Sequence, residues 1–231
     1  MTPRHLLIAG TGRAGTTVLM QLLEACGLNT GAENLTYSGA VRAGLERTFD
    51  PEHSPYVVKH PYLSDDLAGL IDNGFDPALV DAVIVPMRSL DDAAASRIQV
   101  FSERGLLSPG SLWRKRRPGR QRCALAESLH GLLVTTSTNG IPVALVAYPR
   151  FVHDAAYAWK YLEPVLPTVE RETFLASHAD ILRPEMVSVL HYPDRFQMAL
   201  LDAKWVLQSG RLWAGRTLSR RRGGGRTASH H

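Results

Sequence analysis

Residues 5–25 read HLLIAGTGRAGTTVLMQLLEA, and this stretch decides the fold. It opens with a short apolar run at 5–9, which predicts a buried strand, and continues at 16–25 with apolar residues at helical spacing. Three glycines (Gly10, Gly12 and Gly15) lie between the two patterns. Glycines let consecutive backbone N–H groups turn toward one anion, and the following helix adds the positive end of its dipole. The stretch therefore predicts an anion-binding loop, to which Arg13 adds a permanent charge.

The rest of the chain alternates apolar runs with helical patterns. Runs at 56–59, 80–85 and 141–147 predict strands, and helical spacing occurs at 65–73, 91–104, 121–137 and 154–166. Strands separated by helices are typical of parallel sheets. We expect an α/β fold, a three-layer P-loop-like parallel sheet with helices on both faces, formed by one domain over residues 1–210. Ligands of such sheets bind at the carboxyl ends of the strands.

Composition excludes several classes of protein. With 231 residues, 45% of them hydrophobic, the chain suits one globular domain rather than a coiled coil or a disordered protein. Its apolar runs are far shorter than the roughly 20 residues of a membrane span, and the N-terminus lacks a signal-peptide core. The two cysteines, Cys26 and Cys123, form neither a disulfide framework nor a metal-binding spacing. We expect a cytoplasmic protein.

The formal net charge is +4, but the basic residues are concentrated in two segments. Residues 104–122 hold seven basic residues and no acid, and residues 211–231 hold six arginines and no acid. The Pro- and Gly-rich core of the first, 105–120, predicts a basic loop or lid, and the second predicts a disordered tail. Each segment has two interpretations: a solvated basic loop, or a surface that binds an anionic substrate or a membrane. Trp113 is the single aromatic residue of 104–122, so a nucleic-acid partner is not expected.

The glycine stretch is close to the ATP-binding pattern GxxxxGK[ST], with Gly10, Gly15 and Thr17 in register. Thr16 stands where that pattern has its lysine. Because the lysine reaches the β- and γ-phosphates of ATP, its absence disfavours triphosphate chemistry. A P-loop kinase or nucleotide hydrolase is therefore an alternative function rather than the leading one.

Two motifs resemble a known family. Residues 12–17, GRAGTT, resemble the 5′-phosphosulfate loop of sulfotransferases that use 3′-phosphoadenosine 5′-phosphosulfate (PAPS), which commonly reads Arg/Lys-Ser-Gly-Thr-Thr. Residues 86–97, PMRSLDDAAASR, resemble the 3′-phosphate motif of the same family, an Arg that closes a strand and a Ser eight residues later. The resemblance covers residues 5–97 and departs from the pattern at Ala14, which replaces a serine. It implies that PAPS is bound by Gly12, Arg13, Ala14, Gly15, Thr16, Thr17, Arg88 and Ser96.

The resemblance also implies the reaction, transfer of a sulfuryl group to an acceptor hydroxyl by in-line displacement without a metal. Arg13 and the loop amides would neutralise charge on the leaving phosphate. A base must accept the proton of the hydroxyl, and Glu33 is the expected base, with His60 and His53 as rivals. Lys59, at the end of a strand, is expected to contact the sulfuryl oxygens.

The acceptor stays open between a glycan, a lipid and a small natural product. The basic residues beside Trp113 suit an anionic acceptor, and peripheral membrane contact is compatible with both basic segments. A second alternative is a non-catalytic, sulfotransferase-like fold that binds an anionic polymer or a membrane, for which association would depend steeply on salt. The sequence does not specify an oligomeric state.

Overall fold

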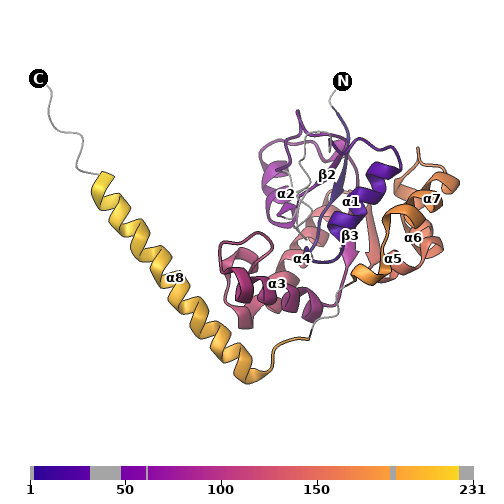
Figure 1. Cartoon of the computed structure of the whole chain (residues 1–231). Coiled ribbons are helices and arrows are strands. Elements are labelled where there is room, and N and C mark those ends of the chain that lie inside the picture. Colours follow the sequence, from indigo (N-terminus) through magenta and orange to yellow (C-terminus); the bar gives the residue numbers. More distant parts are fainter. Residues whose placement is uncertain (1–2, 32–47, 61, 188–190, 224–231) are drawn as a thin grey trace, which may run out of the picture.

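The computed structural model describes residues 3–31, 48–60, 62–187 and 191–223 (Figure 1). Within them, four parallel strands form a sheet in the order β2-β1-β3-β4. The strands are β1 (His5–Ile8), β2 (Val57–Lys59), β3 (Val80–Met87) and β4 (Val143–Ala147). Leu7 of β1 lies opposite Val58 on one side and Val83 on the other. The expected parallel α/β architecture is confirmed.

Helices cover both faces of the sheet. One face carries α1 (Thr16–Ala25), α5 (Arg150–His153), α6 (Ala155–Leu162) and α7 (Arg171–Ile181). The other carries α2 (Leu63–Asp72) and α4 (Gln121–Thr138), with α3 (Leu90–Arg104) packed against α4. Short 3₁₀ turns lie at η2 (Pro77–Leu79), η3 (Trp113–Lys115), η4 (Pro118–Arg120), η5 (Glu163–Val165) and η6 (Pro184–Met186).

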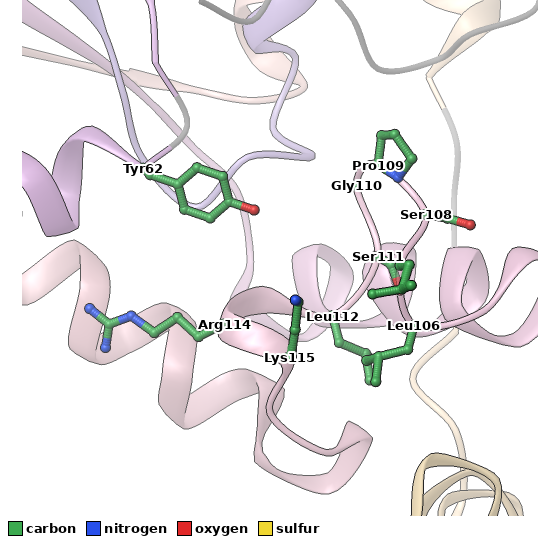
Figure 2. A pocket seen from close by; sticks show the side chains of 10 residues that line it. Tyr62, Leu106, Ser108, Pro109, Gly110, Ser111, Leu112, Arg114 and Lys115 are labelled. Atoms are coloured by element: carbon green, nitrogen blue, oxygen red, sulfur yellow. The ribbon is translucent and has the colours of Figure 1, made fainter. Parts of the chain in front are cut away.

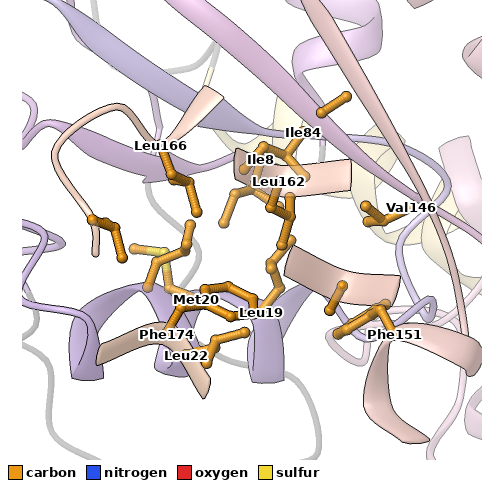
Figure 3. Packing of buried hydrophobic residues seen from close by; sticks show 14 of the residues in the cluster. Ile8, Leu19, Met20, Leu22, Ile84, Val146, Phe151, Leu162, Leu166 and Phe174 are labelled. Atoms are coloured by element: carbon orange, nitrogen blue, oxygen red, sulfur yellow. The ribbon is translucent and has the colours of Figure 1, made fainter. Parts of the chain in front are cut away.

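The alternation of side chains along β1 produces the three layers. Leu6 and Ile8 point into a cluster with Leu19 and Leu22 of α1 and with Phe174 of α7 (Figure 3). Leu7 and Ala9 point to the opposite face, where they meet residues of α2 and α4. Because successive strand residues face opposite sides, one apolar run anchors helices on both faces.

The strand order predicts a ligand-binding crevice beyond the end of β1, where the chain connections to β2 and to β3 run to opposite sides. The chain leaves β1 toward β2 on one side of the sheet and later returns to β3 on the other side of β1. Ligands of doubly wound sheets bind at such a switch point, beyond the carboxyl ends of the strands. Here the glycine loop (residues 9–15) follows β1, and Arg88 follows β3.

The C-terminal region differs from the expected disordered tail. Helix α8 (Arg195–Gly223) is continuous, so that expectation is wrong for residues 211–223, while residues 224–231 lie outside the described residues. The helix is already fixed upstream by packing on the domain, and arginine and leucine extend a formed helix readily until the glycines begin. Its C-terminal half runs out beyond the domain (Figure 1). No helix of the described ranges has both the length and the apolar character needed to cross a membrane.

Candidate functional site

The glycine loop has the backbone of an anion cradle. Gly10, Gly12, Arg13 and Gly15 all have positive φ, at 123°, 60°, 57° and 79°. Gly15 caps α1, and no side chain accepts a hydrogen bond from the first turn of that helix. The first N–H groups of α1 keep their capacity to donate to an anion.

Close packing explains why glycine stands at two loop positions. A Cβ at Gly15 would lie 2.6 Å from Cδ2 of Tyr148 and 3.0 Å from Cζ of Phe151. A Cβ at Gly12 would lie 2.5 Å from Nη2 of Arg97. The loop is thus held between an aromatic ring that follows β4 and a guanidinium from α3, and a side chain at either glycine would force one of these groups to move.

The two sequence motifs meet at Arg13. Its Nε donates a hydrogen bond to the hydroxyl of Ser96 at 2.8 Å, and Nη1 of Arg88 donates to its carbonyl oxygen at 3.0 Å. The glycine loop and the strand-to-helix segment at 86–97 therefore form one site. Ser89 caps α3 by accepting a hydrogen bond from the Asp92 N–H at 3.4 Å.

Tyr148 forms a wall beside these arginines. Its ring lies 5.2 Å from the guanidinium carbon of Arg88, within range of a cation–π contact. Burial raises the pKa of Tyr148, and the neighbouring charges of Arg88 and Arg13 oppose that rise. The phenol is therefore neutral over the physiological range, and it presents an aromatic face and a hydrogen-bonding group next to the two cations.

Lys59 brings a further cation to the loop. It ends β2, is only 3% exposed, and donates from Nζ to the hydroxyl of Thr17 at 2.8 Å. The structure thus excludes a role as a surface lysine. Lys59 therefore places an ammonium group, from the neighbouring strand β2, beside the loop. In that loop, Thr16 stands at the position of the lysine of the ATP-binding pattern.

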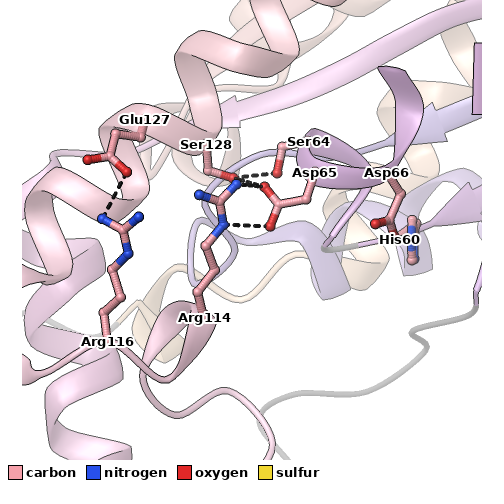
Figure 4. Close-up of polar contacts among 8 residues, drawn as sticks. All are labelled: His60, Ser64, Asp65, Asp66, Arg114, Arg116, Glu127 and Ser128. Carbon is pink, nitrogen blue, oxygen red and sulfur yellow. Dashed lines mark hydrogen bonds and ion pairs between the residues drawn. The ribbon is translucent and has the colours of Figure 1, made fainter. Parts of the chain in front are cut away.

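His60 is the histidine nearest this edge of the sheet among those singled out from the sequence. It is 6% exposed, and its Nε2 lies 2.8 Å from Oδ2 of Asp66 (Figure 4). A carboxylate at one ring nitrogen fixes the tautomer and orientation of an imidazole, as a general base requires. Glu33, the first choice for the base, lies outside the described residues.

His53 lies at the opposite end of the sheet. It is exposed and pairs with Asp50, in a loop whose Pro51 and Pro55 carbonyls contact His5 at the start of β1. That loop therefore packs at the amino ends of the strands, away from the glycine loop. The rival assignment of His53 as a base is wrong on these grounds.

Arg97 is a site residue that no pattern in the sequence predicted. It is buried, and its Nε and Nη2 donate to the carbonyl oxygen of Thr11 at 3.3 and 2.7 Å. Its Nη1 donates to the carbonyl oxygen of Ser111 at 2.9 Å, and its guanidinium lies 4.4 Å from the ring centroid of Trp113. One guanidinium therefore joins the glycine loop to the basic loop 105–120.

A cavity of about 580 Å³ lies between Tyr62 and the basic loop (Figure 2). Tyr62 bounds it on one side, residues 106–112 bound it on the other, and Lys115 points into it. Tyr62 stacks on Trp113 with ring centroids 5.0 Å apart. The guanidinium of Arg97 lies over the ring of the same Trp113, so Trp113 links the cavity wall to Arg97. Nε1 of Trp113 is a buried donor without a hydrogen-bond partner among the described residues.

Ion pairs fix the basic loop against α2 and α4, and a further ion pair joins α4 to α3. Arg114 binds Asp65 through two nitrogens, which raises the pKa of Arg114, and Arg116 lies 2.9 Å from Glu127 (Figure 4). Arg122 pairs with Asp91 at 2.7 Å. Within the described ranges, no carboxylate pairs with the remaining basic residues of the segment, Arg104, Lys115, Arg117 and Arg120. These four residues keep the segment 104–122 electropositive.

The edge of the sheet at the carboxyl ends thus gathers Arg13, Lys59, Arg88 and Arg97 around one loop of backbone donors, next to a cavity of small-molecule size. Such an arrangement suits a ligand with more than one phosphate or sulfate group. The described residues contain no cluster of three His, Cys, Asp or Glu side chains arranged for a metal ion. Comparison with protein-family models, with curated proteins and with solved structures finds no match for this chain.

Proposed function

We propose that the protein is a cytoplasmic PAPS-dependent sulfotransferase that moves a sulfuryl group to the hydroxyl of a small acceptor. The observation that carries the proposal is the meeting of both anion-binding motifs at Arg13, whose side chain bonds Ser96 and whose carbonyl bonds Arg88. Two converging motifs suit a nucleotide that bears phosphate groups at both its 5′ and 3′ positions. The free cysteines Cys26 and Cys123 match a reducing compartment.

In the proposed reaction, the acceptor oxygen forms a bond to sulfur while the bond from sulfur to the 5′-phosphate oxygen breaks. Adenosine 3′,5′-bisphosphate leaves with the bonding electrons, and Arg13, Lys59 and the loop amides stabilise its added charge. His60 takes the proton of the acceptor hydroxyl, and Asp66 stabilises the imidazolium that forms. Glu33 is the rival base.

The cavity between Tyr62 and the basic loop is the proposed acceptor site. Its volume of about 580 Å³ falls in the range of small-molecule pockets. Tyr62, which lines the cavity, is two residues after His60. An acceptor bound in the cavity would therefore lie close to the proposed base, His60. Tyr62, Leu106 and Leu112 favour an apolar or aromatic body, and Lys115 favours an anionic substituent.

The experiment that tests the proposal is transfer of ³⁵S from labelled PAPS to a panel of small phenols and alcohols with and without a carboxylate. His60→Gln is expected to lower kcat by roughly 10²–10⁴-fold. His130→Gln, on the exposed surface of α4, is the matched control and leaves the rate unchanged. A loss of rate in Glu33→Gln instead moves the base role to Glu33, and absence of transfer to every acceptor refutes the proposal.

A kinase or nucleotide hydrolase is the second candidate, because Lys59 supplies a cation beside Thr17. That function predicts binding of ATP together with Mg²⁺ and release of labelled phosphate. Neither is expected under the leading proposal, in which Arg88 and Ser96 bind a 3′-phosphate.

A further inference from the structure

Helix α8 uses one side to pack on the domain. Met198, Leu201 and Trp205 contact a cluster formed by Ile98, Phe101, Leu106 and Leu112. Nε1 of Trp205 donates to the carbonyl oxygen of Lys115 at 2.9 Å, and Oε1 of Gln208 accepts from the Leu106 N–H at 2.9 Å. Residues 198–208 are therefore fixed firmly on α3 and the basic loop.

The other side of α8 exposes apolar side chains. Phe196 is 73% exposed, Leu200 58% and Leu207 67%, and their spacing of four and eleven residues places them on one side of the helix. Val206 beside them is 59% exposed. These are four of the nine large apolar residues that the described part of the chain exposes, gathered on a single helix. Such a concentration marks an interaction surface.

The same region is strongly basic. The sequence of α8 contains seven basic residues, Arg195, Lys204, Arg211, Arg216, Arg220, Arg221 and Arg222, and one acid, Asp202. Asp202 accepts a hydrogen bond from the Gly119 N–H at 3.0 Å, which joins α8 to the basic loop. The basic loop therefore adjoins the first half of α8, which itself carries Arg195 and Lys204.

We propose that this surface, the exposed side of α8 together with the adjoining residues Arg117 and Arg120, binds an anionic lipid bilayer. A basic helix that exposes Phe and Leu side chains on one side lies in the plane of a membrane, with those apolar side chains among the acyl chains. Anionic head groups neutralise the basic residues. This inference is independent of the enzymatic activity.

Charge and apolarity together favour a bilayer over the other occupants. An anionic polymer would bind the arginines but would leave Phe196, Leu200 and Leu207 in water. A second copy of the chain would cover the apolar side chains but would set one basic helix against another, with repulsion between them. Of these three occupants, an anionic bilayer alone matches both properties of the surface.

Co-sedimentation of the full chain with vesicles tests the proposal. Vesicles that contain phosphatidylglycerol are expected to bind it, phosphatidylcholine vesicles are not, and salt is expected to weaken the binding. Leu200→Asn with Leu207→Asn should weaken partitioning at least about tenfold, because two large apolar groups leave the acyl chains. Val134→Asn is the control, at an exposed apolar residue on α4, and this variant should bind as the parent chain does.

The basic component has its own variants. Arg117→Ser with Arg120→Ser should weaken vesicle binding on the order of tenfold or more. Arg171→Ser, at an exposed position of α7, should leave vesicle binding unchanged. The proposal is overturned by equal binding to neutral vesicles, by absence of vesicle binding, or by binding unchanged in the double leucine variant. It is also overturned if sedimentation velocity shows a lipid-free dimer that the double leucine variant dissociates.

Discussion

The Arg88 guanidinium donates a hydrogen bond to the carbonyl oxygen of Arg13 at 3.0 Å, across 75 residues of sequence. The bond ties the segment that follows β3 to the loop that follows β1. It places two permanent cations at the crevice where ligands of parallel sheets bind. The side chain of Arg88 therefore stabilises the loop, and in the proposed function it also binds the 3′-phosphate of the nucleotide.

Arg88→Gln tests the second of these roles. If Arg88 binds the 3′-phosphate, the affinity for adenosine 3′,5′-bisphosphate falls on the order of tenfold to a hundredfold, because a charge-assisted hydrogen bond is lost. The affinity for adenosine 5′-monophosphate falls much less. Isothermal titration calorimetry measures both, with Arg171→Gln as a surface control. Equal losses for the two nucleotides would show that Arg88 acts through the loop alone.

Gly15→Ala and Gly27→Ala separate steric crowding from backbone strain. Both glycines have positive φ, 79° and 85°, but a Cβ at Gly27 meets no atom within 4 Å, whereas one at Gly15 collides with Tyr148. Gly27→Ala should cost about 1–2 kcal/mol of unfolding free energy from strain alone. Gly15→Ala should cost about 1–3 kcal/mol more, because the ring must move. Urea denaturation measures both, and equal costs would refute the packing role of Tyr148.

Lys59 should matter more for activity than for folding. Lys59→Met removes a buried charge and keeps an apolar chain of similar length, so the unfolding free energy should change by less than about 1.5 kcal/mol. The transfer rate should fall by about 10²–10³-fold, because the charge that develops on the leaving phosphate loses a stabilising cation. Lys160→Met, on the exposed side of α6, is the control. A variant that transfers sulfate at the parent rate would remove Lys59 from the site.

Tyr56 should contribute to stability only below strongly alkaline pH. Its hydroxyl donates to Oδ2 of Asp81 at 3.0 Å, and burial together with that carboxylate raises the pKa of Tyr56 from 10.0 to about 12. A raised pKa favours the neutral phenol in the folded state, so the contribution is complete below pH 10 and is lost as the pH rises toward 12.

Tyr56→Phe should therefore be less stable than the parent by about 1 kcal/mol near neutral pH, and the deficit should shrink across that alkaline interval. Urea unfolding at a series of pH values checks this, with Tyr161→Phe, at an exposed ring, as the control. A deficit that stays constant through the alkaline range would contradict the assignment.

Local pattern predicted much of the framework, since the four strands and the helices after them follow from apolar runs and helical spacing near their own residues. The positions of Arg88 and Ser96 also follow from local order, because a strand end and a helix start fix where they emerge. Arg97 and Tyr148 were missed as parts of the site. Arg97 reaches Thr11 and Ser111 through tertiary packing, and no periodicity in the sequence reports such contacts.

Two other features also depended on long-range contacts. The burial of Lys59 results from the position of α1, which brings Thr17 over the end of β2. The extent of α8 depends on the packing of residues 198–208 on the domain, which composition alone does not predict. Tyr148 did carry a usable signal, because an aromatic residue directly after the strand at 141–147 lies at the ligand-binding edge of a parallel sheet.

The central claim is that the loop at Arg13 and the segment at Arg88 and Ser96 bind one nucleotide with phosphates at both ends of its ribose. Calorimetric titration of the full chain with adenosine 3′,5′-bisphosphate, and separately with ATP and Mg²⁺, tests it most directly. The account predicts saturable, metal-independent binding of the bisphosphate and much weaker binding of ATP. Binding of ATP with Mg²⁺, without binding of the bisphosphate, would contradict it.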